Sequence, residues 1–305
     1  RLAGALAEID SDDGDGSDDR DAGLLMRVIE TMTMFEQYVH GYHEKENRRL
    51  HDQAGTLVEL LHGDTYYPSA TTVLEAGSGV GAQTVALAVR SPGAAFTCLD
   101  TSSDSLGQAR TRLMAAGCDN VTFVQGDVFE LPHAEGPLAA GTFDHLFVCF
   151  LLEHLSRPAE ALTRLRAMLK PGGTITVIEG DHGSTYFHPD SDVARAAIDC
   201  QVRLQRHAGG DALIGRRLYP LLAAAGYRDL EVSPRQVYVD GSRPELADGF
   251  IRKTFTPMID GVRHAALAGG LIEAERFDAG IRDLLRTAEA DGVFCYTFFK
   301  ATAIA

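Results

Sequence analysis

The stretch that decides the fold runs from Val73 to Ala82 and reads VLEAGSGVGA. An apolar segment, Thr72–Ala76, leads into a loop of spaced glycines, and a helical pattern at Ala82–Val89 follows the loop. The glycines are Gly77, Gly79 and Gly81. Glycines at such a junction let the backbone turn tightly and approach a ligand closely. The stretch therefore predicts a strand, a ligand-binding loop and a helix, and a bare tight turn is the alternative.

Downstream of this loop the pattern alternates between strand and helix. We expect strands at Ala95–Asp100, Val121–Gln125, Phe143–Phe150 and Thr174–Glu179, and helices at Ser103–Ala116 and Pro158–Leu169. Such alternation predicts an α/β fold with a doubly wound, mostly parallel sheet. Further strands are expected at Arg228–Asp240 and Val293–Ile304, with helical segments at Ser191–His207, Gly215–Ala225, Glu245–Leu267 and Glu273–Glu289. A terminal strand that returns after a long helical excursion predicts a helical cap.

The chain divides into four segments by composition. Residues 1–22 are an acidic, flexible leader, and residues 23–63 carry two helical patterns that we expect to close over a cofactor or to join subunits. Residues 64–187 form the ligand-binding core, and residues 188–305 complete the sheet and supply the cap.

Charge and composition exclude several classes of protein. The chain has 43 acidic and 28 basic residues and a net charge of -15, so it lacks the basic surface that nucleic-acid binding requires. No apolar run approaches the length that crosses a bilayer, so no membrane association is expected. Five scattered cysteines without a Cys-x-x-Cys pair predict free thiols in a reducing, cytoplasmic compartment and no metal site.

Two carboxylates indicate what the glycine loop binds. Asp100 ends the second strand, where a carboxylate accepts hydrogen bonds from ribose hydroxyls, so a nucleoside-bearing cofactor is expected. The loop also fits the dinucleotide pattern G-x-G-x-x-G/A, with Ala82 in the last place. Glu75 favours S-adenosylmethionine (SAM), because a carboxylate beside the loop would attract its ammonium and repel a pyrophosphate.

Three later motifs agree with a nucleoside cofactor. Gly126-Asp127-Val128 follows the third strand, and Phe143 begins an apolar run that ends at Leu155. The third motif runs from Leu169 to Gly173 and reads LKPGG. Together with the glycine loop, these motifs over residues 71–180 resemble the class I SAM-dependent methyltransferases. The resemblance implies a Rossmann-like sheet of seven strands with the last strand antiparallel.

The resemblance also implies roles for individual residues. The three glycines would lie along the methionine part of SAM, Asp100 and Thr101 along the ribose, and Asp127 and Val128 along the adenine. Phe150 and His154, at the end of the fourth strand, are further cofactor candidates, although His154 and its neighbour Glu153 can equally cap the next helix. Arg49 and Gln53 resemble part of a helix that closes over the methionine end in some members, and a solvated helix face is the alternative for Arg49.

Catalytic candidates follow the fifth strand, in a segment that we expect to be a loop at residues 179–189. Methyl transfer requires a base only if the acceptor must lose a proton. His182 is the preferred base because its unperturbed pKa suits neutral pH, and His188 is the reserve. Tyr42 and Tyr186 are expected to orient the acceptor or to stabilise positive charge. The alternatives are a capping histidine and ordinary half-buried tyrosines.

The acceptor is expected to be an apolar small molecule, because the cap is apolar and the surface acidic. Three segments, HGYHE at 40–44, GDHGSTYFHP at 180–189 and FCYTFFK at 294–300, resemble a narrower group, the bacterial methyltransferases of specialised metabolism such as the carbon methyltransferase of teleocidin assembly. This resemblance implies a prenylated indole or terpenoid alkene, although an oxygen acceptor fits the same residues. The apolar stripe of residues 24–38 predicts a homo-oligomer. One alternative is an NAD(P)-dependent oxidoreductase, which would carry the Tyr-x-x-x-Lys dyad of short-chain reductases, and our expectation that the chain lacks this dyad weakens it. A non-catalytic scaffold of the same fold is the other.

Overall fold

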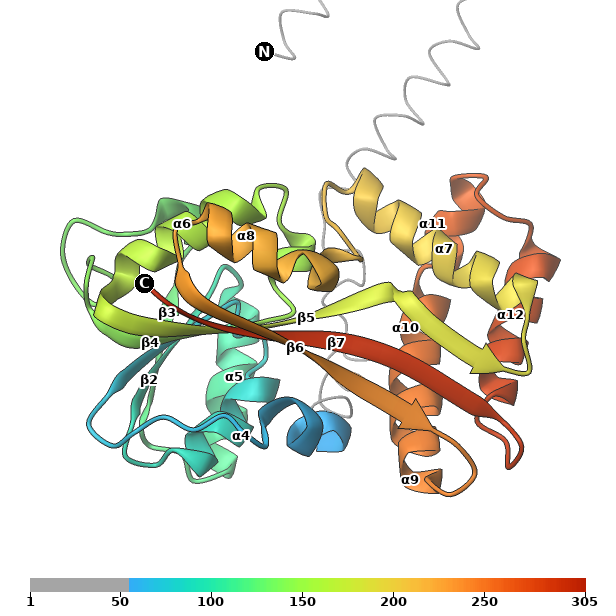
Figure 1. The fold of residues 1–305 in the computed structure, drawn as a ribbon, viewed down its shortest axis with the longest axis horizontal. Helices are drawn as coiled ribbons and strands as arrows, with labels where there is room; N and C mark the ends of the chain where they lie inside the picture. Colours follow the sequence, from blue (N-terminus) through green and yellow to red (C-terminus); the bar gives the residue numbers. More distant parts are fainter. Residues whose placement is uncertain (1–54) are drawn as a thin grey trace, which may run out of the picture. The chain divides into compact units, whose positions relative to one another are not determined.

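The computed structural model describes residues 55–305, which contain a seven-stranded sheet flanked by helices (Figure 1). The strand order is β3-β2-β1-β4-β5-β7-β6. The strands are β1 (Thr72–Ala76), β2 (Ala95–Asp100), β3 (Val121–Gln125), β4 (Phe143–Cys149), β5 (Leu169–His188), β6 (Arg228–Val239) and β7 (Val293–Ile304). Neighbouring strands from β3 to β5 are parallel, and β7 is antiparallel to both β5 and β6. The predicted fold class and the antiparallel last strand are confirmed.

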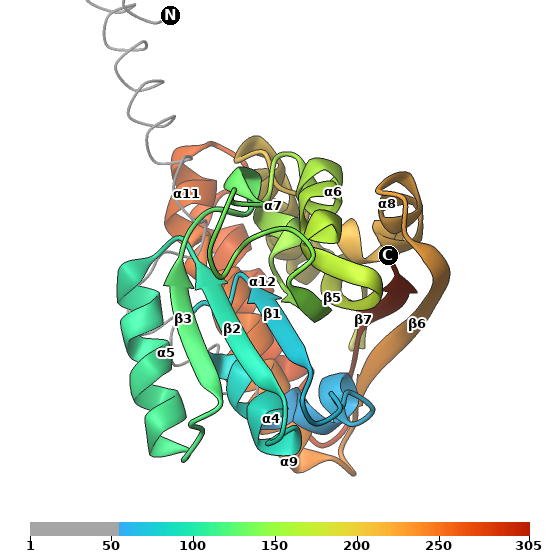
Figure 2. The same cartoon turned by 90° about the vertical axis from the view of Figure 1, so that its left-hand side faces the viewer.

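Helices cover both faces of the sheet. On one face lie α4 (Ala82–Arg90) and α5 (Ser103–Ala115), and on the other lie α6 (Pro158–Met168) and α8 (Leu218–Ala224) (Figure 1). Turned by 90°, the molecule shows β1, β2 and β3 side by side with α4 and α5 beside them (Figure 2). In residues 55–305 no helix is both long and apolar enough to cross a bilayer. The leader, the helical pattern at 24–38, Tyr42, Arg49 and Gln53 lie outside the described residues.

Short buried strands form the centre of the molecule. Val73, Leu74 and Ala76 of β1 are fully buried, as are Leu146, Phe147 and Val148 of β4. Such continuous apolar runs are typical of parallel strands covered on both faces. Local caps fix the junctions: the Ser102 side chain accepts the Ser105 N–H at the start of α5, and Asp127 caps the 3₁₀ turn η1 (Val128–Glu130). These junctions place the carboxyl ends of the parallel strands at one edge.

The fifth strand is longer than expected. The predicted loop at residues 179–189 is wrong, because β5 continues to His188 and its last residues pair with Val293–Cys295 of β7. The register shifts between Asp181 and Tyr186, and the Phe187 and Phe294 rings stack across the pair. The long antiparallel partner satisfies backbone groups that a loop would expose to water. One sheet therefore runs through both residues 64–187 and residues 188–305.

The helical cap packs beside the extended strands (Figure 1). Its elements are α7 (Asp192–His207), the 3₁₀ turn η3 (Ile214–Arg217), α9 (Pro244–Leu246), the π-helical segment η4 (Ala247–Phe255), α10 (Thr256–Gly261), α11 (Arg263–Ala268) and α12 (Ala274–Arg286). The single helix expected at Glu245–Leu267 is therefore broken into shorter pieces. Pro257 and Gly261 lie at these breaks, as expected of residues that disfavour a helix interior. Phe250, Phe255 and Phe277 are buried and form the core of the cap.

Candidate functional site

The glycine loop is held by the neighbouring strand. Gly77 and Ser78 both donate their backbone N–H groups to the carbonyl oxygen of Leu99, at 2.8 and 3.0 Å. Gly77, Gly79 and Gly81 all have positive φ values, of 73°, 51° and 72°. This left-handed conformation is strained for other residues, so the loop depends on glycine. Gly81 also begins α4 and allows α5 to pack closely, because an added Cβ would lie 3.0 Å from the Cβ of Ala109.

Asp100 and Gly79 together form a cradle at the end of β1 and β2. The Asp100 carboxylate accepts the N–H of Gly79 at 2.8 Å and the N–H of Ser102 at 2.9 Å, so it joins the loop after β1 to the turn after β2. An added Cβ at Gly79 would meet no atom within 4 Å. The backbone of Gly79 therefore faces open space beside a carboxylate at the carboxyl edge of the sheet. This open space is where the sequence predicts the ribose and methionine parts of SAM.

The structure corrects the role expected for Glu75. Its side chain is only 2% exposed and packs near Thr84 of α4, 4.0 Å from Sγ of Cys98 on β2. Burial, aided by the nearby charge of Asp100, raises the pKa of Glu75 to about 7. The carboxylate is therefore not a fixed anion at neutral pH, and direct attraction of an ammonium by Glu75 does not decide between SAM and a dinucleotide.

The remaining residues predicted to bind the cofactor lie at the same edge. Asp127 follows β3 and accepts the N–H of Phe129 at 2.9 Å, while Val128 is buried behind it. Thr101 is exposed after β2, and its carbonyl oxygen accepts the side-chain amide of Gln125. His154 lies in the 3₁₀ turn η2 (Leu152–His154), where its Nε2 is 3.7 Å from the Glu153 carboxylate. These positions are compatible with the expected ribose and adenine contacts.

A turn after β4 connects the glycine loop to the rest of the edge. Phe150 has a positive φ of 56°, which is unfavourable for a bulky residue. The buried carboxylate of Glu179, on β5, accepts the backbone N–H groups of Leu151 and Leu152 at 3.0 and 2.7 Å and so holds this turn. An added Cβ at Gly77 would lie 2.8 Å from the Leu151 side chain. Glu179 thereby positions Leu151 against the glycine loop.

His182 is part of a second, aromatic cluster. Its side chain is 6% exposed, and its Nδ1 lies 3.0 Å from the hydroxyl of Tyr296 on β7. Its ring also contacts Phe255 of the cap, with centroids 6.2 Å apart. Tyr296 packs against Phe250 and Phe298, and the Phe298 ring lies 5.4 Å from that of Phe150. The cluster therefore joins β5, β7, the cap and the turn after β4.

Two polar networks surround this aromatic cluster. Asp181 is buried and accepts two hydrogen bonds from Arg216 of η3, at 2.6 and 2.8 Å. On the other side, Gln205 of α7 donates to the carbonyl and carboxylate oxygens of Glu153, at 3.0 and 3.1 Å. Three of these residues were not predicted from the sequence: Tyr296, Arg216 and Gln205. Each is far from its partner in the chain, and no local motif marks the pairing.

The other catalytic candidates lie elsewhere. Tyr186 is 52% exposed, and its hydroxyl accepts the Gln236 side-chain amide, so it does not belong to the cluster around His182. The expectation that Tyr186 orients the acceptor is therefore corrected. The reserve base His188 is exposed at the end of β5. Tyr42 lies outside the described residues, as do Arg49 and Gln53.

Comparison with known proteins agrees with this geometry. Residues 73–173 match the family model described as a methyltransferase domain. The trans-aconitate 2-methyltransferase of Paracidovorax citrulli is 29% identical over 83% of this chain and 94% of its own length. An uncharacterised 37.1 kDa protein of a Streptomyces fradiae transposon is 32% identical over 59% of this chain, which spans about half of that relative. The sequence match and the seven-stranded sheet support a class I SAM-dependent methyltransferase.

Solved structures share the methyltransferase fold at low sequence identity. A protein from Bacillus halodurans that is assigned to the methyltransferases has a TM-score of 0.51 and 18% identity, over 81% of this chain and 97% of its own. The phosphoethanolamine N-methyltransferase 2 of Haemonchus contortus, solved with SAM, has a TM-score of 0.51 and 17% identity, over 83% of this chain and 52% of its own. At this identity the match shows the fold alone.

The reductase dyad requires a correction. Tyr296 and Lys300 have Tyr-x-x-x-Lys spacing, so the prediction that the chain lacks this pattern is wrong. However, both residues belong to the strand β7, where four residues span about 13 Å, whereas a helix would bring them together. The Lys300 ammonium is also buried and bound to Asp64 and Thr65, both at 2.6 Å. The pair does not form a catalytic dyad.

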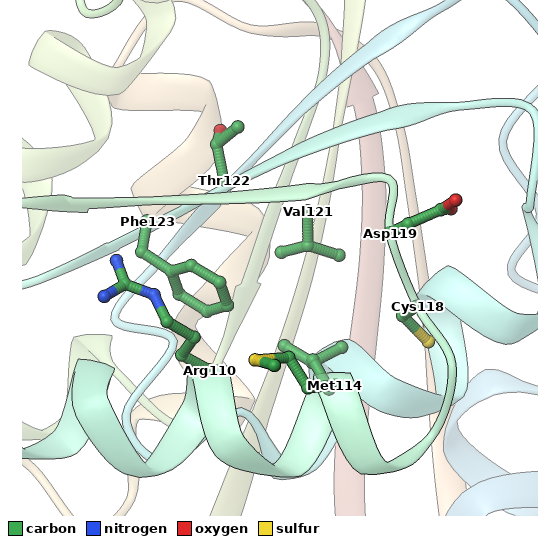
Figure 3. A pocket seen from close by; sticks show the side chains of 8 residues that line it. Arg110, Met114, Cys118, Asp119, Val121, Thr122 and Phe123 are labelled. Atoms are coloured by element: carbon green, nitrogen blue, oxygen red, sulfur yellow. The ribbon is translucent and has the colours of Figure 1, made fainter.

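A surface hollow of about 440 Å³ lies between α5 and β3 (Figure 3). Its lining includes Arg110 and Met114 of α5 and Val121 and Phe123 of β3, with the Arg110 guanidinium 5.2 Å from the Phe123 ring centroid. Val121 begins β3, so the hollow lies toward the amino ends of the strands, opposite the glycine loop. Ligands of open α/β sheets bind at the carboxyl ends, and we assign no catalytic role to this hollow.

Proposed function

We propose that this chain transfers the methyl group of SAM to an apolar small molecule of specialised metabolism. The observation that carries the proposal is the cradle formed by Gly79 and Asp100, where a left-handed glycine faces open space beside a carboxylate. Gly77, Gly79 and Gly81 would hold the methionine part, Asp100 and Thr101 the ribose, and Asp127 and Val128 the adenine, with Phe150 and His154 near the methionine end. When bound, SAM supplies a methyl group on a sulfonium, which is already activated for in-line displacement.

The acceptor would bind on the other side of the turn after β4. The support is the buried cluster of His182, Phe255 and Tyr296, which offers a polar atom among aromatic rings. Aromatic faces stabilise positive charge, and the absence of bulk water favours displacement on a bound acceptor. A prenylated indole or another terpenoid alkene is the acceptor class that we propose, with His182 in contact with it. Carbon and oxygen methylation both fit this arrangement.

The remaining proposals concern the setting of the reaction. We propose a homo-oligomer that forms through the N-terminal helices, a cytoplasmic location and no nucleic-acid partner. The net charge of -15 supports the last of these. One fold neighbour, with a TM-score of 0.50 and 19% identity, is a [4+2]-cyclase, so the decisive experiment must measure methyl transfer itself.

The test uses two variants, one expected to lose SAM affinity and the other expected to lose turnover. SAM with a labelled methyl group is incubated with the full chain and a panel of prenylated indoles and terpenoid alkenes, and SAM affinity is measured by calorimetry. We expect Asp100→Ala to weaken SAM binding about 100-fold, because it removes charge-assisted hydrogen bonds from the loop and the ligand. We expect His182→Ala to lower turnover at least about 100-fold with SAM affinity changed by less than about twofold.

The controls define what would contradict the proposal. Asp119→Ala removes an exposed carboxylate far from the cradle and should change neither quantity. Unchanged SAM affinity in Asp100→Ala would overturn the ribose assignment. Binding of NAD in place of SAM, or the absence of label from every acceptor, would overturn the methyltransferase proposal. Equal turnover in His182→Ala and wild type would remove His182 from the acceptor site.

A further inference from the structure

The two edges of the sheet differ in how they are protected. β6 ends the sheet on one side and carries Pro234, the charged Arg235 and a register shift between Arg228 and Glu231. Such features keep further strands from pairing with an exposed edge. β3 ends the sheet on the other side and reads VTFVQ, with no charge, no proline and a regular register against β2. Within residues 55–305, β2 is the only strand paired with β3, so the outer edge of β3 is open to another strand.

Alternate residues of β3 have backbone groups that β2 does not pair. Phe96 of β2 lies opposite Val121 in the register and donates its N–H to the Asn120 carbonyl oxygen at 2.8 Å. In a parallel pair, the residues that bond to the neighbouring strand alternate with residues whose groups point to the other side. The N–H and C=O groups of Val121 and Phe123 therefore point away from β2, where a further strand could pair with them.

The hollow between α5 and β3 lies beside this open edge and has opposite charges at its two ends. From one end to the other, Figure 3 shows Arg110 against Phe123, then Met114 below Val121, then Asp119. Met114 is 72% exposed, although its flexible thioether is suited to filling an irregular apolar contact. A partner that fits the hollow should therefore be apolar in the middle, negative opposite Arg110 and positive opposite Asp119.

A second copy of this chain meets these requirements when it is turned by a two-fold axis through Val121. The axis makes the two β3 strands antiparallel and joins the two sheets into one. Asp119 and Phe123 are equally far from Val121 in the chain, so Asp119 of one copy lies opposite Phe123 of the other. The Arg110 guanidinium, 5.2 Å from the Phe123 ring centroid, then faces that Asp119 carboxylate. An axis through Phe123 would instead bring the two Arg110 side chains together, which like charges disfavour.

We propose that the β3 edge is an interface between two copies of this chain, in which the strands pair antiparallel about Val121 and Arg110 of each copy binds Asp119 of the other. The two-fold symmetry makes the charge pair occur twice, once at each end of the interface. The two Met114 side chains meet near the axis and fill the hollow with apolar atoms. This interface is separate from the one proposed for the N-terminal helices and does not depend on methyl transfer.

The first test exchanges the two charges in the full chain. Sedimentation at low salt over a range of protein concentrations gives the dissociation constant of the step that doubles the mass. We expect Arg110→Glu or Asp119→Arg alone to raise this constant at least about tenfold, because like charges then meet at both ends of the interface. The double variant Arg110→Glu with Asp119→Arg restores opposite charges and should return to within about threefold of the wild type.

A control variant separates this pair from a general effect of charge. Arg276→Glu makes the same change on an exposed residue of α12 and should leave the dissociation constant unchanged. A wild-type chain that stays monomeric, or equal constants in the wild type and both single variants, would overturn the interface. A double variant that associates no better than the single variants would overturn the pairing of Arg110 with Asp119.

The second test observes the strand edge itself, by hydrogen exchange of single backbone amides followed by NMR. In the associated wild type, we expect the amides of Val121 and Phe123 to exchange at least about tenfold more slowly than in Arg110→Glu. The amide of Val124 faces β2 and should exchange equally in both proteins. Equal exchange of Val121 and Phe123 in both proteins would show that no second copy pairs with β3. Protection of these amides in a chain that sedimentation shows to be monomeric would mean that another segment of the same chain covers the edge, and would exclude the second copy.

Discussion

The two halves of the carboxyl edge are built on different principles. The half after β1, β2 and β3 is made mainly of backbone groups, and its central bond, Gly79 to Asp100, joins residues 21 positions apart. The half beyond β4 is made of side chains from the extended part of β5 and the amino-terminal part of β7, and its central bond, His182 to Tyr296, joins residues 114 positions apart. A backbone cradle serves any SAM enzyme of the fold, whereas a side-chain cluster can change with the acceptor.

The difference extends to how each half tolerates substitution. In the first half, the conformation of the glycines and one carboxylate carry the geometry. In the second half, buried polar groups depend on partners from distant elements, as Asp181 depends on Arg216 and Glu153 on Gln205. Removing one partner leaves the other buried without its hydrogen-bond partner, which is unfavourable. Stability and site geometry should therefore be coupled more strongly in the second half.

The largest effect is expected at the Asp181–Arg216 pair. Asp181 is 2% exposed and receives two hydrogen bonds from the guanidinium and one from the N–H of Gly183. Arg216→Met leaves this carboxylate buried without its counter-charge, so we expect the free energy of unfolding to fall by about 3 to 4 kcal/mol. Urea unfolding at pH 7.5, followed by circular dichroism, measures the change.

The adjacent arginine provides the control. Arg217 is about as exposed as Arg216, at 53% against 49%, but its partner Asp211 is 25% exposed where Asp181 is 2% exposed, so Arg217→Met should cost less than about 1 kcal/mol. The double variant Asp181→Asn with Arg216→Met removes the stranded charge and should recover part of the stability. Equal effects of Arg216→Met and Arg217→Met would show that the second half does not depend on its buried pair.

The same contrast explains how much the sequence predicts. The strands β1, β2, β3 and β7 have the bounds expected from the apolar pattern, because each is rich in apolar residues and lies between turn residues, although no residue of β3 is fully buried. Asp100 and the three glycines were identified because their partners are close in the chain. The continuation of β5 to His188 was missed, because its polar sequence forms a strand only when paired with β7. Tyr296 was missed for a similar reason: its proximity to His182 comes from the sheet and has no local signal.

Glu75 yields the next prediction, because it is a buried acid in the first half. Its pKa in the native chain is about 7, against an ordinary value of 4.5. The native state therefore holds an extra proton between pH 4.5 and 7, and stability falls as pH rises through this window. Glu75→Gln removes the titration. The free energy of unfolding of Glu75→Gln, relative to that of the wild type, should rise by about 3 kcal/mol from pH 4.5 to pH 8, as the shift of the pKa implies.

Urea unfolding of both proteins at several pH values in this range measures that difference. Glu231→Gln, which removes an exposed glutamate from β6 of the same sheet, should show a difference from wild type that does not change with pH. A pH-independent difference for Glu75→Gln as well would mean that Glu75 ionises normally. In that case the Glu75 carboxylate would be an anion at neutral pH and would attract the ammonium of SAM, as the sequence predicts.

The smallest effect is expected at Gly79 and tests the backbone cradle itself. Gly79→Ala meets no neighbour within 4 Å but keeps a φ of 51°, so we expect it to cost about 1 kcal/mol of stability. Its methyl group would enter the space assigned to the ligand, and SAM affinity should fall about tenfold, or about 1.4 kcal/mol. Gly117→Ala has a similar φ of 72° and equally open surroundings, but it lies away from the cradle and should lose stability alone. If the two alanine variants bind SAM equally well in calorimetry, the open space at Gly79 is not where the ligand lies. The half of the edge built from backbone groups would then not be the part that binds SAM.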